Sequence, residues 1–384
     1  MKRIKTIVFG LIFSGSSYGQ TLPPKQAHPS TITQIHSGHS LTDPLFSNWP
    51  GQYINLIANQ NSLEAWKLFD VLVGKSTVPG STIKARWENP PGFGAPDARL
   101  GIGNWQLLSI TERVPLAYQG GNKQQWYLNQ IQDQKEYLSL FVNNAWNNGN
   151  NGNGAPTLLW TTWTNIDDRD GPWRNMLDTQ GAEFERMQDY ANLNKPSKAP
   201  HVYIIPGHKM FAKLYDDIQL NLVPGITKID QFFSDKIHTN ELGAYAIALI
   251  HYACIFNQSP VGLPNNLLPN AASGTPIPSP ELALYLQNMI WEVVTNYPRT
   301  GITNNLSAHL PESSGNSFVV YPNPATNSIN IVLGKNAENQ PVYIYDFLGK
   351  VFYSGYDKTI DINDFPDGLY LLKVGNTSKK FIKQ

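Results

Sequence analysis

The sequence predicts an α/β domain built on a parallel sheet, followed by a small all-β sandwich. Between about residues 32 and 297, short apolar runs alternate with longer helical patterns, which is typical of repeated β-α units. A stretch rich in Asn, Ser, Thr, Gly and Pro at residues 299–316 indicates a linker. Short β-type runs separated by turns come after it. A chain of 384 residues has room for all these parts.

Five apolar runs are the expected strands of the parallel sheet: residues 32–37, 68–73, 106–110, 157–161 and 201–205. Several of them stand directly before polar or glycine-containing turns. In open α/β sheets, ligands collect at the carboxyl ends of the strands. We therefore expect the functional residues in the turns that follow these runs.

A nearly uninterrupted series of small and apolar residues at 240–256 predicts a buried helix late in the domain. His251 and Cys254 lie three residues apart on it. Interior packing explains this pair better than a metal or redox site, because cysteine behaves as a small hydrophobic residue.

The composition excludes several classes of function. The 29 Lys and Arg residues balance 29 Asp and Glu residues, so nucleic acid is not an expected partner. A single cysteine excludes an intrachain disulfide framework and a zinc site built from paired thiolates. The sequence has no Walker-type phosphate loop, no His-Glu-x-x-His and no calcium-loop spacing, so we expect no metal and no cofactor.

Residues 1–19 predict a secretory signal peptide. Three of the first five residues are basic, residues 7–13 are apolar, and Ser16, Ser17 and Gly19 are small. The apolar run is shorter than the roughly 20 residues that span a bilayer, and no later run is long enough. We therefore expect an exported protein without a transmembrane segment, whose first domain covers residues 20–298.

Two segments carry the residue types of a serine nucleophile and its base. GHSLTD at residues 38–43 follows the first expected strand, and SDKIH at residues 234–238 precedes the buried helix. A serine hydroxyl is a weak nucleophile until an imidazole accepts its proton, and the imidazole needs an acceptor on its other nitrogen. Three residues of separation let Asp235 fold back onto the ring of His238. Each segment alone is a weak signal, and the two together, in this order and about 200 residues apart, are a much stronger one.

This pair of segments resembles the first and last sequence blocks of the SGNH (GDSL-type) hydrolase superfamily, Gly-Asp-Ser-Leu and Asp-x-x-His. The resemblance covers most of residues 30–260 and implies a flavodoxin-like parallel sheet flanked by helices. By position it makes Ser40 the nucleophile, His238 the general base and Asp235 the residue that orients the base. His39 stands where the superfamily has aspartate, and we expect a structural role for it because the side chains of adjacent residues diverge.

The resemblance also implies an oxyanion hole made of the nucleophile's own N–H, a glycine N–H and an asparagine side chain. Ser40 and Gly80 match the first two, and Gly80 lies in a turn beyond the second expected strand. Glu112 stands where the asparagine is expected, and a glutamate donates a hydrogen bond only when protonated. Either Glu112 is held neutral, or another donor replaces it, or the site is weakened or repurposed. Asn104 is an alternative donor, but it precedes its strand rather than following it.

Three further residues are expected to line the substrate cleft. Trp163 follows the fourth expected strand, His208 follows the fifth, and Asn240 lies two residues after His238. Aromatic faces suit sugar rings or acyl chains, although most of the ten tryptophans are expected in the core.

The last part of the chain predicts a small immunoglobulin-like sandwich. Its expected strands are residues 329–333, 342–346, 351–353, 359–362 and 369–374. YPNP at residues 321–324, DGLY at residues 367–370 and a lysine-rich end resemble the C-terminal sorting domain of the type IX secretion system of Bacteroidetes, over residues 317–384. The resemblance implies a protein that engages the type IX secretion machinery and is secreted or attached to the cell surface. The strands alone leave a carbohydrate-binding or fibronectin-like sandwich equally open.

Together these features predict a secreted serine esterase that forms an acyl-enzyme on Ser40. Export, a sorting domain and abundant aromatic residues favour acetyl or other acyl esters of a polysaccharide as substrate. A lipase or phospholipase type of esterase is a further alternative. Glu112 at the donor position favours a different class, a non-catalytic SGNH-like protein that binds glycan at the cell surface.

Overall fold

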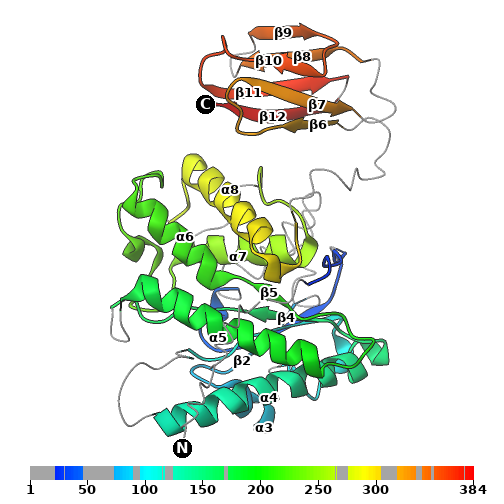
Figure 1. Ribbon diagram of the computed structural model, residues 1–384, viewed down its shortest axis with the longest axis vertical. Coiled ribbons are helices and arrows are strands. Elements are labelled where there is room, and N and C mark those ends of the chain that lie inside the picture. Colours follow the sequence, from blue (N-terminus) through cyan, green and yellow to red (C-terminus); the bar gives the residue numbers. More distant parts are fainter. Residues whose placement is uncertain are drawn as a thin grey trace, which may run out of the picture. The chain divides into compact units, whose positions relative to one another are not determined.

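The computed structural model of the chain divides into two compact units, with the boundary between Asn304 and Asn305 (Figure 1). The predicted signal peptide, residues 1–19, lies outside the described residues. The structure describes residues 22–29, 31–45, 73–89, 96–114, 116, 124–167, 172–263, 265, 276–303, 318–333, 340–346, 350–375 and 377–384.

The first unit is built around a five-stranded parallel sheet. Its strands are β1 (Gln34–Gly38), β2 (Val73–Thr77), β3 (Leu107–Ile110), β4 (Thr157–Trp160) and β5 (Tyr203–Ile205). They are hydrogen-bonded in the order β2-β1-β3-β4-β5, with Gln34 of β1 opposite Val73 of β2 and Leu107 of β3. This is the flavodoxin-like order, and it confirms the predicted fold class.

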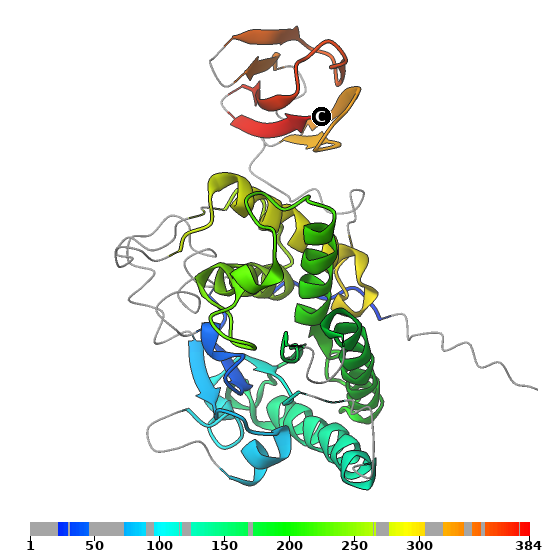
Figure 2. The ribbon, with the colours of Figure 1, turned by 90° about the vertical axis from the view of Figure 1, so that its left-hand side faces the viewer.

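Helices cover both faces of the sheet. They are α3 (Ile83–Glu88), α4 (Gln124–Asn148), α5 (Trp173–Asn194), α6 (Gly207–Gln219), α7 (Glu241–Phe256) and α8 (Pro280–Asn296). On β1, the ring of His36 contacts His251 of α7, whereas Ser37 accepts a hydrogen bond from Arg86 of α3. Successive side chains of a strand point to opposite faces, so α3 and α7 lie on opposite sides of the sheet. Helix α4 packs against α3 and α5 (Figure 2). Short 3-10 helices cover Asp43–Leu45, Ile102–Asn104, Asn150–Gly152, Ile229–Phe232 and Pro298–Thr300.

Helix α7 is enclosed on all sides, as its composition predicts. Every residue from Gly243 to Phe256 is buried, because the helix lies between the sheet and α8. Its cysteine, Cys254, has no role at the surface. Burial raises the pKa of the Cys254 thiol to about 12, which keeps it protonated and unreactive.

Both ends of the first unit contain residues that are anchored in it although the local composition does not indicate this. Lys25 lies in a segment without periodicity, yet it is buried and its Nζ donates to the Ile255 carbonyl and to Asn257 Oδ1. At the other end, Arg299 is paired with acidic side chains of α5, and Ile302 is buried. The side chains of Arg299 and Ile302 therefore anchor residues whose composition is typical of a linker. The linker expected from residue 299 starts after them.

The second strand is displaced from its predicted position. β2 begins at Val73, the last residue of the run expected at 68–73, and the rest of that run lies outside the described residues. β2 is an edge strand that exposes Lys75 and contains Ser76. An edge strand need not be apolar on both faces, so the search for an apolar run missed it.

The second unit consists of two small antiparallel sheets around one core, as predicted. Its strands are β6 (Phe318–Tyr321), β7 (Ser328–Leu333), β8 (Val342–Asp346), β9 (Val351–Gly355), β10 (Thr359–Asp361), β11 (Gly368–Val374) and β12 (Thr377–Lys383). The strand orders are β10-β7-β6 and β12-β11-β8-β9, and one hydrophobic cluster joins them. The prediction missed β6 and β12. β12 exposes Lys379 and Lys380 beside the buried Phe381, so its apolar pattern is weak.

Candidate active site

A serine, a histidine and an aspartate meet beyond the carboxyl end of β1. Ser40 lies two residues after this strand, and its Oγ is 3.0 Å from Nε2 of His238. Nδ1 of His238 is 2.7 Å from Oδ2 of Asp235. An ionised carboxylate only accepts hydrogen bonds, so Nδ1 carries the ring proton and Nε2 is left to accept from the Ser40 hydroxyl. The imidazole is thereby oriented to act as a base toward the serine.

The loop that carries Asp235 and His238 is held by its own backbone. Oδ1 of Asp235 accepts hydrogen bonds from the N–H groups of Ile237 and His238, at 2.8 and 2.7 Å. The bond from the His238 N–H is the main reason that the pKa of Asp235 is lowered to about 2. The carboxylate is therefore ionised at neutral pH. It remains half exposed, so the site is open to solvent.

The turn that carries Ser40 is tight. A Cβ atom on Gly38 would lie 2.1 Å from Oγ1 of Thr42, so only glycine fits at the end of β1. The turn closes through hydrogen bonds from the Thr42 N–H to the His39 carbonyl, at 2.8 Å, and from the Asp43 N–H to the Ser40 carbonyl, at 3.2 Å. Ser40 keeps part of its surface exposed within this turn.

His39 connects this turn to the end of β3. Its imidazole is buried, and burial is the main cause that lowers its pKa to about 3, so the ring is neutral. Nδ1 accepts from the Leu41 N–H at 3.3 Å, so Nε2 carries the proton and donates to the Glu112 carbonyl at 3.1 Å. This arrangement agrees with the structural role expected for His39.

Glu112 does not face the site. Its carboxyl group is fully buried and accepts hydrogen bonds from the N–H of Ile83, the first residue of α3, at 3.0 Å, and from the Arg113 N–H. Burial raises the pKa of Glu112 to about 7. Even a protonated Glu112 would lie against the start of α3, so the explanation in which it serves as a neutral oxyanion donor is not supported by this geometry.

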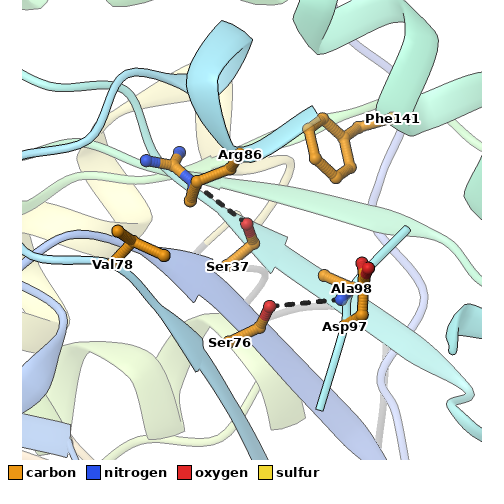
Figure 3. Close-up of a pocket in the computed structure, with 7 residues that line it drawn as sticks. All are labelled: Ser37, Ser76, Val78, Arg86, Asp97, Ala98 and Phe141. Carbon is orange, nitrogen blue, oxygen red and sulfur yellow. Dashed lines mark hydrogen bonds between the residues drawn. The ribbon is translucent and has the colours of Figure 1, made fainter. Parts of the chain in front are cut away.

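A buried arginine joins the ends of the first three strands. Arg86 of α3 donates to Ser37 Oγ at 3.1 Å, to the carbonyl and hydroxyl of Ser81 at 3.0 Å each, and to the Thr111 carbonyl. Burial lowers its pKa to about 10, so it stays charged at neutral pH. Figure 3 shows this side chain in a small pocket on the α3 side of the sheet. The pocket is lined by Ser37, Ser76, Val78, Arg86, Asp97, Ala98 and Phe141.

Gly80 lies in the turn between β2 and α3. Its φ of +66° is left-handed, and a Cβ atom built on it would have no atom within 4 Å. The residue thus faces open space rather than the core. Its carbonyl accepts a hydrogen bond from Nη1 of Arg113 at 3.2 Å. The sequence did not draw attention to Arg113 or Arg86, and the only available signal was that Arg113 directly follows the unexpected glutamate.

Trp163 and His208, expected to line the cleft, are fully buried. Trp163 packs in the aromatic core and donates from Nε1 to the Ile237 carbonyl at 2.8 Å, which holds the loop that carries Asp235 and His238. His208 Nδ1 is 2.7 Å from Thr161 Oγ1, and burial lowers the pKa of His208 to about 3. Neither side chain has surface with which to contact a substrate, so both are removed from the candidate site.

Asn240 and Asn104 also have other roles. Oδ1 of Asn240 accepts from the Leu242 and Gly243 N–H groups, and Nδ2 donates to the Gln231 carbonyl, so the amide caps the start of α7. Asn104 precedes β3 and therefore lies at the amino end of the parallel strands, whereas Ser40 lies at their carboxyl end. Among the described residues, no group of three or more His, Cys, Asp or Glu side chains could hold a metal ion.

Ser40, His238 and Asp235 are hydrogen-bonded in series beyond the end of β1, and the sheet order gives the first unit a flavodoxin-like α/β fold. Solved structures similar to it include a DUF4886 family protein from Bacteroides uniformis, with 10% identity, 70% of this chain and 96% of the other covered, and a TM-score of 0.46. An acetyl xylan esterase variant from Geobacillus stearothermophilus has 16% identity, coverage of 57% and 92%, and a TM-score of 0.37. A protein described as a GDSL-like lipase, from Parabacteroides merdae, has 15% identity, coverage of 62% and 97%, and a TM-score of 0.34.

Residues 319–384 match the family model of the secretion system C-terminal sorting domain. This tail indicates type IX secretion to the cell surface or the outside of the cell, which confirms the predicted localisation. No helix among the described residues is long and apolar enough to cross a membrane. No curated protein sequence matches the chain.

Proposed function

We propose that the first unit is a serine esterase that hydrolyses carboxylic esters through an acyl-enzyme on Ser40. The observation that carries this proposal is the hydrogen-bonded series Ser40, His238 and Asp235, with distances of 3.0 and 2.7 Å. The three residues come from two loops far apart in the sequence. Their proton arrangement is the one that activates a serine hydroxyl.

The reaction follows from these positions. Oγ of Ser40 attacks the ester carbonyl carbon, its proton moves to Nε2 of His238, and the carbonyl electron pair moves onto the oxygen. When that pair returns, the bond to the alcohol breaks and the alcohol oxygen takes the proton from His238. A water molecule then repeats both steps on the acyl-enzyme, which releases the acid and restores the Ser40 hydroxyl. Asp235 stays ionised and stabilises the imidazolium that forms twice in this cycle.

Acylated polysaccharide is the substrate class that we favour. Secretion places the enzyme where polymers of the surroundings are within reach, and the half-exposed His238 and Asp235 leave the site accessible to a large substrate. Lipid esters are the alternative within the same chemistry. Activity against a series of p-nitrophenyl esters of increasing acyl length separates the two, because an acetylesterase loses activity steeply beyond short chains whereas a lipase gains it.

The esterase proposal is tested with p-nitrophenyl acetate and purified protein. We expect Ser40→Ala and His238→Ala to lose at least about 10³-fold in kcat/KM, because the triad acts as a unit. Ser197→Ala and His201→Ala are matched controls, since both residues lie just before β5, at the opposite edge of the sheet, and should retain wild-type activity. Full activity of both triad variants would refute the assignment.

A non-catalytic glycan-binding role remains the second candidate, because Glu112 does not provide the third oxyanion donor. Wild-type protein that neither hydrolyses esters nor reacts with a fluorophosphonate probe, yet is retained on an insoluble polysaccharide, would favour this class. Retention lost in Ser40→Trp, which would block the same surface, would assign the binding to this site.

A further inference from the structure

The third donor position of the proposed oxyanion hole needs a side chain other than Glu112. Two backbone N–H groups, those of Ser40 and Gly80, are in turns suited to the role. Removal of one oxyanion donor typically lowers turnover by about 10²–10³-fold. A site with only two donors would therefore have low turnover. The loop after β3, where the asparagine is expected, is the segment expected to supply the third donor.

Arg113 is the donor that this loop offers. It directly follows Glu112, and its side chain is partly exposed whereas that of Glu112 is enclosed. Nη1 of Arg113 donates to the Gly80 carbonyl at 3.2 Å, so the guanidinium group lies along the turn that carries the second candidate donor. This bond uses one of the five N–H groups of the guanidinium.

The charge of Arg113 also reaches the nucleophile turn. Burial and the charge of Arg86 are the largest causes that lower the pKa of His39, and the charge of Arg113 adds to them. Since His39 directly precedes Ser40, Arg113 lies close enough for its positive charge to act on the turn that carries the nucleophile. The loops are further joined by hydrogen bonds from Val78 to Gly38 and from His39 to Glu112, at 3.0 and 3.1 Å.

We propose that Arg113 is the third oxyanion donor, with its guanidinium in the role that an asparagine amide has in the SGNH superfamily. The inference rests on the proposed esterase function. When Ser40 attacks, the electron pair of the carbonyl moves to oxygen, and an N–H group of Arg113 donates to that oxygen. A charged donor makes a shorter and stronger hydrogen bond to an anion than an amide does. Glu112 then has a different task, which is to hold the start of α3 and so the Gly80 turn.

The test is a series of substitutions at Arg113 in the full chain. We expect Arg113→Ala to lose about 10²–10³-fold in kcat with little change in KM, because the interaction forms only in the transition state. Arg113→Gln, which restores an amide, should recover part of this loss, and added guanidinium salt should raise the rate of Arg113→Ala at concentrations that leave the wild type unchanged. Arg186→Ala is the control, since Arg186 is an exposed arginine of α5 that pairs with Glu183 along its own helix.

Binding of a boronic acid provides a second readout. A boronate forms a tetrahedral adduct with a catalytic serine, so its affinity should fall in Arg113→Ala by a factor similar to the loss in kcat. Wild-type kcat in Arg113→Ala, or loss of activity without loss of boronate affinity, would overturn the inference. An effect on KM alone would also overturn it, because it would assign Arg113 to substrate binding. A wild type that is inert toward esters and fluorophosphonate would instead refute the underlying esterase proposal.

Discussion

At the residue scale, the Asp235–His238 pair contributes orientation rather than stability. The two side chains are about half exposed, and exposed ion pairs add little to the free energy of folding. The aspartate is nevertheless held firmly, because two backbone N–H groups bind its second oxygen. The loop therefore fixes the carboxylate, and the carboxylate fixes the ring.

Asp235→Asn is expected to separate these effects. The asparagine oxygen can still accept the two backbone N–H groups, but the amide no longer supplies a charge and can impose the wrong tautomer on His238. We expect kcat to fall by about 10⁴-fold with a shift in Tm of only a few degrees. The measurements are p-nitrophenyl acetate kinetics and thermal unfolding, with Asp230→Asn on the neighbouring exposed turn as control. Wild-type kcat in Asp235→Asn would remove Asp235 from the triad.

At the element scale, the start of α7 sets the position of the loop that carries Asp235 and His238. His238 lies two residues before Asn240, whose amide caps the helix and also binds the Gln231 carbonyl at 2.8 Å. The loop is closed further by hydrogen bonds from the N–H and the hydroxyl of Ser234 to the His238 carbonyl, at 2.8 and 3.1 Å. The capped N-terminus of this buried helix thus positions His238 next to Ser40, which follows β1.

Asn240→Ala should therefore lower both stability and activity. Loss of the N-cap costs about 1 kcal/mol in the free energy of unfolding. We also expect a several-fold decrease in kcat, because the loop before the cap carries the base. Urea denaturation and ester hydrolysis measure the two effects. Asn240→Ser, which retains a capping oxygen, should recover most of both, and Asn194→Ala at the exposed end of α5 serves as control. Equal losses in the serine and alanine variants would contradict the capping role.

At the scale of the whole first unit, four buried histidines make stability depend on pH. His36, His39, His208 and His251 are buried, and burial is the main cause that lowers the pKa of each. Their pKa values in the folded state lie below the unfolded value of about 6.5. Their stabilising contribution is therefore complete above pH 6.5 and is lost as the pH falls toward about 4 and then 3, the folded-state values of His251 and His39.

The expected result is steep acid unfolding. Each histidine that is protonated only in the unfolded chain lowers the free energy of unfolding by about 1.4 kcal/mol per pH unit. Denaturation from pH 7.5 to 4.5, followed by tryptophan fluorescence, measures the effect in the first unit, because all ten tryptophans precede residue 304. A free energy of unfolding that stays constant between pH 6.5 and 5 would show that these rings are not held neutral.

Much of the fold could be predicted because its signals are local. Buried parallel strands are apolar on both faces, so four of the five strands were found close to their positions. β2 was displaced and β12 was missed, because polar residues in β2 and lysines in β12 interrupt the apolar pattern. Ile302 was assigned to the linker, and Lys25 lies in a segment without periodicity at the start of the domain. Contacts with distant residues, and not local composition, bury both side chains.

The sequence by itself determined the class of sheet, the order of the proposed catalytic residues along the chain and the sorting tail, because each depends on a local pattern or motif. The direction of individual side chains was decided by the tertiary structure. Glu112 turns toward the start of α3, Trp163 enters the core below the catalytic loop, and Arg113 reaches the Gly80 turn. These side-chain directions depend on which buried surfaces and hydrogen-bond partners the fold brings close. The position of a residue along the sequence does not specify those partners.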